Sequence, residues 1–151
     1  MTDATLDSFL ANLPRFDSLS DRDRQALSLA LERRSLAAGD KVITQDQRGD
    51  GAYFLISGEL RVEIEVDGAT KEVGVVTPGE LFGVLAMVDH RPRSASCVAK
   101  EASEIAFLSR PAFEMLAHRH AGIGYPFQRA VAAQVASDFR EAVARIRGHL
   151  S

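Results

Sequence analysis

The chain has a single cysteine, Cys97, and no long apolar run. One thiol excludes a disulfide within the chain, and a reduced compartment is the default for such a protein. Nowhere do about 18 apolar residues follow one another, and the segment from Met1 to Leu10 carries acids but no basic apolar run. We therefore expect a soluble, cytoplasmic protein with neither a membrane span nor a secretory leader.

An excess of basic charge is also missing. The net charge is −3 at pH 7 and the pI is 5.8, and the arginine pairs Arg91/Arg93 and Arg145/Arg147 are too small for a nucleic-acid footprint. Direct binding to DNA or RNA is disfavoured. With 151 residues, 46% of them hydrophobic, the chain is long enough for one core and too short for two, so we expect one domain over residues 1–151.

Catalytic and metal-binding motifs are absent from the sequence as well. It contains no nucleophile elbow, no Walker loop and no paired catalytic carboxylates, so we expect no enzyme activity. Among the histidines only His118 and His120 are close, and no third ligand stands at a suitable spacing. A cupin-like metal site would need such a pair on barrel strands, whereas this pair falls at a predicted helix end. We expect no metal and no resident cofactor.

Two helices are predicted at the amino-terminal end. Apolar residues recur at helical spacing before Pro14, which ends the first helix. Ser20, followed three residues later by Asp23, predicts the start of a second helix. We extend that helix through Arg33-Arg34, because cations suit the carboxyl end of a helix. The helical segment is therefore predicted over residues 5–35.

The middle of the chain has the pattern of antiparallel β structure. Residues 59–66 alternate between apolar and charged side chains, as a half-buried strand requires. Asp67-Gly68 is typical of a hairpin turn, and the return strand includes residues 73–76. Several short strands with glycine at their corners predict a β-roll over residues 36–108.

Helices return after the roll, over residues 110–149. Ser109 is the expected N-cap of the first, and Gly122 and Gly124 are expected to end it. Pro126 then opens a long amphipathic helix. Apolar residues on this helix follow one another at steps of three or four: Phe127, Val131, Val135, Phe139, Val143, Ile146 and Leu150.

The stretch over residues 79–95 is typical of an anion-binding loop. Gly79 and Gly83 flank a short apolar turn, so the backbone can bend sharply and bring its N–H groups close to a ligand. Arg93 follows, and its planar fork of donors suits a phosphate better than a lysine does. Two small residues come next and leave room for a ligand.

This pattern resembles the phosphate-binding cassette of cyclic-nucleotide-binding domains, as found in catabolite-activator-type regulators. The residues that would line the ligand site are Phe82, Gly83, Val84, Leu85, Arg93, Ser94 and Ala95. The resemblance covers roughly residues 10–146 and implies an α+β fold, a jelly-roll-like antiparallel β-roll flanked by N-terminal helices and a long C-terminal helix. It implies a non-catalytic regulatory module that binds a cyclic mononucleotide such as cAMP or cGMP, with Arg93 on the phosphate. The family's helix-turn-helix does not follow in this sequence.

One position departs from the family pattern. In the family a glutamate directly after the second glycine accepts a hydrogen bond from the ribose 2′-hydroxyl, and here Val84 takes its place. Losing a charge-assisted hydrogen bond costs about 1.5–3 kcal/mol. Three alternatives stay open: a ligand-free dimerisation or docking module with a degenerate pocket, a sensor of another ligand such as a cyclic dinucleotide, or a site in which Glu80 supplies the missing carboxylate.

The resemblance also implies roles for the last helix. In the family this helix covers the ligand and pairs with its twin across a twofold axis. We therefore expect a homodimer through the C-terminal helix, and we take Gln134, Ser137 and Arg140 as candidates for a lid over the base. Ligand would favour the state with this helix docked, and a protein effector would respond to that state.

Overall fold

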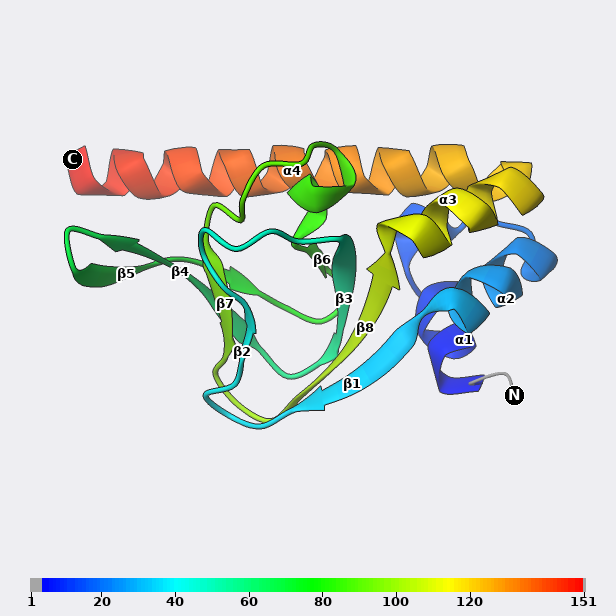
Figure 1. Ribbon diagram of the computed structural model, residues 1–151, viewed down its shortest axis with the longest axis horizontal. Coiled ribbons are helices and arrows are strands. Elements are labelled where there is room, and N and C mark those ends of the chain that lie inside the picture. The colour runs from blue at the N-terminus through cyan, green and yellow to red at the C-terminus, as the bar shows by residue number, and fades with distance from the viewer. Residues whose placement is uncertain (1–3, 151) are drawn as a thin grey trace.

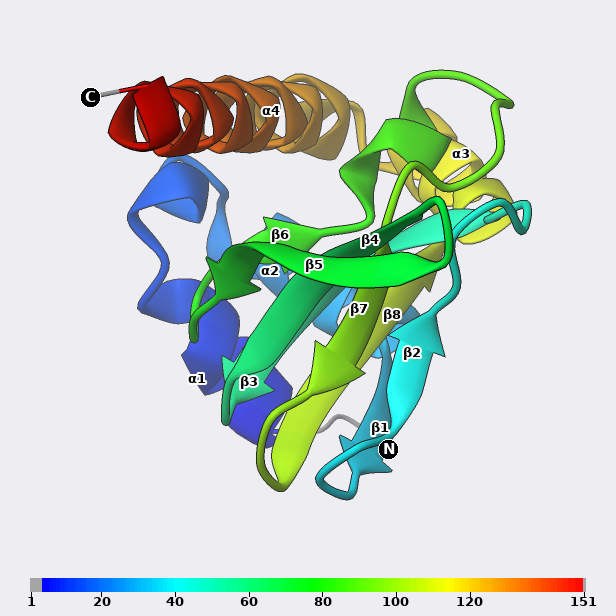
Figure 2. The ribbon, with the colours of Figure 1, turned by 90° about the vertical axis from the view of Figure 1, so that its left-hand side faces the viewer.

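Two antiparallel sheets of four strands form the centre of the molecule (Figures 1 and 2). The computed structural model describes residues 4–150, with side chains over residues 5–148. The strand order is β1-β8-β3-β6 in one sheet and β2-β7-β4-β5 in the other. The strands are β1 (Glu32–Leu36), β2 (Lys41–Ile43), β3 (Gly51–Ser57), β4 (Leu60–Val66), β5 (Ala69–Val76), β6 (Leu81–Phe82), β7 (Ser96–Ala99) and β8 (Ser103–Ser109). The predicted antiparallel β-roll is confirmed.

Helices lie at both ends of the roll, as expected. They are α1 (Ala4–Ala11), the short 3₁₀ helix η1 (Pro14–Phe16), α2 (Asp21–Ala30), α3 (Arg110–Arg119) and α4 (Ala121–Leu150). A further 3₁₀ turn, η2 (Val84–Met87), lies between β6 and β7. In Figure 1, α4 runs along one side of the roll, and its carboxyl-terminal half lies beside the β4–β5 hairpin.

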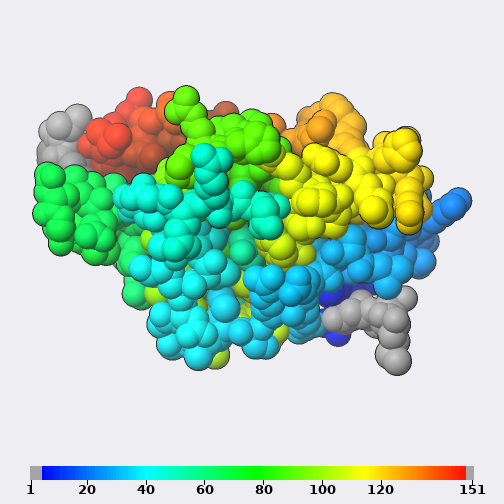
Figure 3. Space-filling view, in the orientation of Figure 1, coloured from blue at the N-terminus to red at the C-terminus, as the bar shows by residue number. Residues whose placement is uncertain are grey.

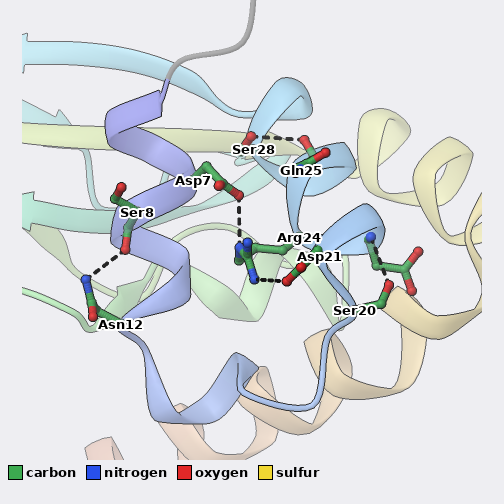
Figure 4. Close-up of polar contacts among 9 residues, drawn as sticks. Asp7, Ser8, Asn12, Ser20, Asp21, Arg24, Gln25 and Ser28 are labelled. Carbon is green, nitrogen blue, oxygen red and sulfur yellow. Dashed lines mark hydrogen bonds and ion pairs between the residues drawn. The ribbon is translucent and has the colours of Figure 1, made fainter.

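Polar contacts join α1 and α2 (Figure 4). The guanidinium of Arg24 in α2 donates to Asp7 of α1 at 2.9 Å and to Asp21 of its own helix at 2.9 Å. The Ser20 hydroxyl accepts from the backbone N–H of Asp23 at 3.1 Å, which is the predicted N-cap. The two helices therefore form one unit at the end of the roll.

The second helix is shorter than the sequence predicted. We expected it to continue through Arg33 and Arg34, but α2 ends at Ala30 and both arginines lie in β1. There Arg33 pairs with Ala106 of β8 in an antiparallel ladder. The prediction was wrong because this strand pairing outweighs the local preference of cations for a helix end.

The last helix begins earlier than the sequence predicted. Gly122, Gly124 and Pro126 were expected to separate two helices, but all three lie inside α4. A Cβ at Gly122 would lie 2.4 Å from a carboxylate oxygen of Asp23 in α2. The start of α4 therefore lies against Asp23 of α2, and this tertiary contact outweighs the poor helix propensity of the segment.

Aromatic rings from both ends of the chain meet in the main core. The ring of Phe54 in β3 lies 5.7 Å from Phe16 of η1 and 6.4 Å from Phe127 of α4, between centroids. Phe127 also packs on Phe113 of α3 at 4.7 Å. Because these rings are large apolar surfaces, their burial holds the first half of α4 on the roll.

Two leucines of α2 allow a matched test of this core. Leu27 is 0% exposed and Leu29 is 58% exposed. We expect Leu27→Ala to lower the free energy of unfolding by about 2–5 kcal/mol, because it leaves a cavity, and Leu29→Ala to change it by less than about 0.5 kcal/mol. Urea denaturation followed by circular dichroism measures both. Equal effects of the two substitutions would contradict the described packing of α2.

Candidate functional site

The loop over residues 79–95 leaves β6, turns through η2 and returns to β7. Gly79 and Gly83 have φ values of 93° and 66°, in the left-handed region that favours glycine. A Cβ at Gly83 would lie 2.7 Å from the Cδ1 atom of Ile43. The sharp bends predicted from the glycine spacing are therefore present, and a Cβ at Gly83 would also require the side chain of Ile43 to shift.

Arg93 bridges this loop and strand β3. Its Nη1 donates to the carbonyl of Gly83 at 2.7 Å, and its Nη2 donates to the carbonyl of Gly51 at 3.1 Å. Gly49 lies against the guanidinium, since a Cβ there would be 2.1 Å from the Cζ atom of Arg93. A guanidinium has five N–H donors, and the two described bonds use two of them. Sequence reasoning missed the roles of Gly49 and Gly51.

Arg110 holds the outer part of the loop. At the start of α3, its Nη2 donates to the carbonyl of Ala86 and, at 2.9 Å, to that of Asp89. Its Nη1 lies 2.7 Å from the His90 ring. The loop is thus tied to β3 through Arg93 and to α3 through Arg110.

Arg93 lines a cavity of about 400 Å³ between the loop, the second sheet and α4. All of the predicted ligand-site residues line it: Phe82, Gly83, Val84, Leu85, Arg93, Ser94 and Ala95. The opposite wall is apolar and consists of Ile43, Val62, Ile64, Val73, Val75, Val76 and Cys97. The structure therefore brings the predicted residues together, and the apolar wall from the sheet adds residues that the motif did not indicate. Their roles in binding stay predictions.

The wall at Val84 is apolar and tightly packed. Val84 is 3% exposed and belongs to the same core cluster as Phe54 and Leu81. Its side chain offers no hydrogen-bond acceptor to a ligand. A ligand hydroxyl against this position would find no partner there.

Glu80, the proposed substitute, lines the same cavity but is held by protein donors. One carboxylate oxygen accepts from the backbone N–H of Thr77 at 2.9 Å and from its hydroxyl at 2.7 Å. The other accepts from Nε2 of Gln134 at 3.0 Å. A ligand would have to compete with these bonds for the carboxylate.

Helix α4 supplies the remaining wall. Of the three lid candidates, Gln134 lines the cavity, whereas Ser137 and Arg140 are not among its lining residues. Asp138, Glu141 and Ala142 line it instead. Sequence reasoning missed them, although Asp138 and Glu141 follow Gln134 by four and seven residues and so share its face of a helix.

Asp138 lies at the rim of the cavity. The residue is exposed as a whole, yet its carboxyl group accepts from the buried amide of Gln134 at 3.0 Å. Partial burial raises the pKa of this carboxyl, the bond from Gln134 opposes that rise, and the negative charges of Glu80 and Glu141 add to it. The cavity therefore has arginine on the loop side and carboxylates on the α4 side, and suits a ligand with an anion at one end and N–H donors at the other.

Two of the histidines, His90 and His120, contact protein side chains. Nδ1 of His120 lies 3.4 Å from a carboxylate oxygen of Asp23, where α3 ends and α4 begins. Within residues 4–150, the structure places no three or more His, Cys, Asp or Glu side chains so that they could hold a metal ion. No helix in this range combines the length and the apolar composition needed to cross a membrane.

Comparison with known proteins identifies the family. Residues 33–120 match the family model of the cyclic nucleotide-binding domain. The chain therefore belongs to the cyclic nucleotide-binding domain family, and it is homologous to regulatory subunits of cAMP-dependent protein kinases. It is 36% identical over 111 residues to the type II regulatory subunit of Drosophila melanogaster, covering 73% of this chain and 29% of that protein. It is 32% identical over 125 residues to the regulatory subunit of Mycosarcoma maydis, covering 80% and 24%. The chain thus spans less than a third of the length of these relatives.

Solved structures show the same fold. The Thermus thermophilus catabolite activator protein aligns with a TM-score of 0.71 and 30% identity, over 89% of this chain and 62% of that one. The regulatory domain of Toxoplasma gondii PKA, crystallised with cAMP, aligns with a TM-score of 0.67 and 30% identity, over 75% and 43%. A cyclic nucleotide-binding domain from Methylobacillus flagellatus KT has a TM-score of 0.85 at 23% identity, over 97% and 83%, which supports the fold alone.

The thiol in the cavity wall gives a test of how closed the site is. Cys97 is buried, and this burial raises the pKa of its thiol to about 12. Because the thiolate is the reactive form, we expect a maleimide at pH 8 to label folded Cys97 at least about 100-fold more slowly than the unfolded chain. Mass spectrometry of timed samples, with and without guanidinium, measures this. Labelling at the unfolded rate would show that the wall opens freely.

The same shift has a consequence for stability. The unfolded thiol loses its proton near pH 9.0 and the folded one near pH 12. Between these values the unfolded state binds fewer protons than the folded state, so the free energy of unfolding falls as pH rises through this window. Below pH 9 the contribution of this thiol is fully present.

Proposed function

We propose that this domain is a non-catalytic regulatory module that binds a cyclic mononucleotide, such as cAMP or cGMP, in the cavity beside Arg93. The observation that carries the proposal is the half-buried guanidinium of Arg93, which lines an otherwise largely apolar cavity. Membership of the cyclic nucleotide-binding domain family and the cAMP in the Toxoplasma gondii structure support it.

The polarity of the cavity suggests how the ligand lies. The phosphate lies against Arg93, because a guanidinium fork matches its oxygens. The base points toward α4, where Asp138 and Glu141 accept hydrogen bonds from its N–H groups. Ser94 directly follows Arg93 in the sequence. It therefore lies next to the phosphate and can contact either the phosphate or the base. The ligand thereby joins the loop to the helix and favours the docked position of α4.

The buried valine sets the expected affinity. A ribose 2′-hydroxyl near Val84 has no carboxylate partner, which costs about 1.5–3 kcal/mol, or one to two decades of affinity. A cyclic dinucleotide, which can place a second phosphate near Arg91 at the rim, is the alternative ligand.

A second function is favoured by the contacts of Arg93 itself. Its guanidinium is bound to two backbone carbonyls, and Val84 is packed in the main core, so protein groups alone make these contacts. The loop and the wall of the cavity are therefore stabilised by contacts within the protein. The domain would then serve as a dimerisation or docking module without a ligand.

Isothermal titration calorimetry separates the two functions. We expect heat on titration with cAMP or cGMP, and we expect Arg93→Ala to abolish it because the anion loses its cation. Arg140→Ala is the matched control, since Arg140 is an exposed arginine that does not line the cavity. This control should bind as the unchanged protein does.

Two further results bear on the same proposal. Val84→Glu should raise the affinity for a cyclic mononucleotide by about 10-fold to 100-fold, provided that a thermal melt shows a folded variant. If cAMP, cGMP and cyclic dinucleotides all give neither heat nor a thermal shift, nucleotide binding is refuted and the docking function is favoured.

We also propose that α4 pairs with α4 of a second copy. The apolar stripe expected from the sequence is divided in the structure, because Phe127 and Val131 are buried in the core while Phe139 is 69% exposed. An outer stripe with a seven-residue spacing remains, formed by Tyr125, Ala132, Phe139 and Ile146. A coiled-coil contact repeats every seven residues, and this stripe supplies one position of each repeat. The side chain of Leu150, another expected member, lies outside the described residues.

Sedimentation velocity tests this pairing. We expect a dimer for the unchanged chain, and a monomer for Phe139→Glu, because the substitution buries a charge in the contact. Ala133→Glu is the control, since Ala133 is exposed on α4 but lies off the outer stripe. A monomer at every concentration for the unchanged chain would refute the homodimer.

A further inference from the structure

Arg110 lies outside the loop over residues 79–95, yet its side chain contacts the tip of that loop, residues 86–90. Its Nη2 donates to the carbonyl of Ala86 and, at 2.9 Å, to that of Asp89. In Figure 3 the green surface of the loop meets the yellow surface of α3. Arg110 is not among the residues that line the cavity. It therefore acts on the loop from outside the proposed ligand site.

The backbone that carries Arg110 is fixed to the sheet. Its N–H donates to the carbonyl of Asp50 at 2.6 Å, and the preceding residue, Ser109, pairs with Gly51 in the β3–β8 ladder. The Ser109 hydroxyl also accepts from the N–H of Ala112 at 3.1 Å and caps α3. The guanidinium therefore reaches the loop tip from a rigid base.

The rest of the loop is fixed by other contacts. Val84 is buried in the core, and the backbone N–H of Arg93 donates to the carbonyl of Gln47 at 2.7 Å. Residues 88–91 are exposed, and the bonds described for their backbone N–H groups stay within the loop. Arg110 therefore supplies the contacts that fix the exposed part of the tip against α3.

The imidazole of His90, in the loop tip, makes this contact sensitive to protons. The Nη1 atom of Arg110 lies 2.7 Å from Nδ1 and 2.8 Å from Nε2 of the ring. A neutral imidazole offers one acceptor to the guanidinium, whereas a protonated imidazole has two N–H groups and no acceptor. Protonation therefore replaces a hydrogen bond with a contact between like charges.

Further charged groups surround this pair. Arg91 is the next residue, and Nη1 of Arg48, between β2 and β3, lies 3.4 Å from the carbonyl oxygen of His90. On the acidic side, the carboxylate of Asp89 accepts from the backbone N–H of Arg91 at 3.1 Å, and Asp50 directly precedes β3. Arginines thus come from α3, from the loop and from the segment before β3. Because histidine changes its charge between about pH 5 and pH 8, the contact weakens as the pH falls through this range.

We propose that Arg110 is a positioning residue that fixes the tip of the anion-binding loop, and that His90 weakens this contact as the pH falls. The fixing of the tip stands by itself. Its effect on a bound anion rests on the proposed function, because the tip belongs to the loop that carries Arg93. A loop that is fixed in advance has less conformational freedom to lose on binding, so it binds its ligand more tightly.

Amide hydrogen exchange of the ligand-free chain at pH 7.5 tests the fixing of the tip. We expect Arg110→Gln to lower the protection of residues 86–90 by about 10-fold relative to that of strand β3. Mass spectrometry of peptic peptides measures this protection. Arg119→Gln is the matched control, since Arg119 is exposed at the other end of α3. Equal protection in the two variants would overturn the positioning role.

A pH series tests the part played by His90. After correction for intrinsic exchange, we expect the protection of residues 86–90, relative to that of β3, to fall by about 10-fold between pH 7.5 and pH 5. His90→Asn offers an amide oxygen to Arg110 at every pH, so its protection should stay constant. His118→Asn changes an exposed histidine of α3 and should keep the response of the unchanged chain.

A residue with a merely structural role would give no such pH profile. If the pH response survives in His90→Asn, another group causes it, and the part assigned to His90 is wrong. Should Arg110→Gln fail to fold by circular dichroism, the comparison of His90→Asn with the unchanged chain decides the inference.

Calorimetry with cAMP or cGMP tests the effect on a bound anion. At pH 7.5 we expect Arg110→Gln to weaken binding by about 10-fold, whereas Arg93→Ala abolishes it and Arg119→Gln leaves it unchanged. At pH 5 the unchanged chain should bind about 10-fold more weakly than at pH 7.5, beyond any change in His90→Asn. That variant accounts for the protonation of cavity carboxylates such as Asp138.

The outcomes separate this inference from the proposed function. Equal nucleotide affinity of Arg110→Gln and the unchanged chain would refute the effect on the anion and leave the proposed function intact. If no nucleotide binds, the proposed function and the effect on the anion both fail, while hydrogen exchange still decides whether Arg110 fixes the loop tip.

Discussion

The bridge from Arg93 to the carbonyls of Gly83 and Gly51 is the interaction on which the site depends. It places a cation between the loop and strand β3, where both carbonyls are fixed by the fold. This close approach requires glycine, since a side chain at Gly49 or Gly83 would collide with the arginine. The same bonds that orient the guanidinium for the proposed anion also hold the loop to β3. Arg93 therefore stabilises the loop and, in the proposed function, also binds the anion.

Helix α4 has two functions in the fold, and they fall on different stretches of it. Up to Gln134 it is part of the core, with Phe127 packed on rings from three other elements. Beyond Gln134 it is a wall of the cavity and an outer surface at the same time. Because one helix forms both, a ligand that moved this stretch would also move the surface proposed for the contact with a second copy.

The sequence predicted those features that depend on local constraints. Glycine at positive φ, the Ser20 and Ser109 caps and the Asp67-Gly68 hairpin each leave a pattern within a few residues. The start of β1 at Glu32, the continuity of α4 through Pro126 and the cavity contact of Asp138 do not. These three features depend on distant parts of the chain. Strand β1 pairs with β8, the start of α4 lies against α2, and the rotation of α4 about its axis brings Asp138 to the cavity. Phe82 to Ala95 could be named as a site because the family motif is contiguous, whereas residues facing it from the sheet and α4 are brought there by folding.

Helix α4 extends well beyond Gln134, its last buried residue, so a small tilt at that residue moves the far end of the helix by a larger distance. At 1.5 Å per residue, the stretch after Gln134 is roughly 24 Å long. A tilt of about 10° at that point displaces its tip sideways by about 4 Å. A lateral displacement of that size breaks or forms van der Waals contacts, so a small change in angle at Gln134 decides which side chains touch at the far end.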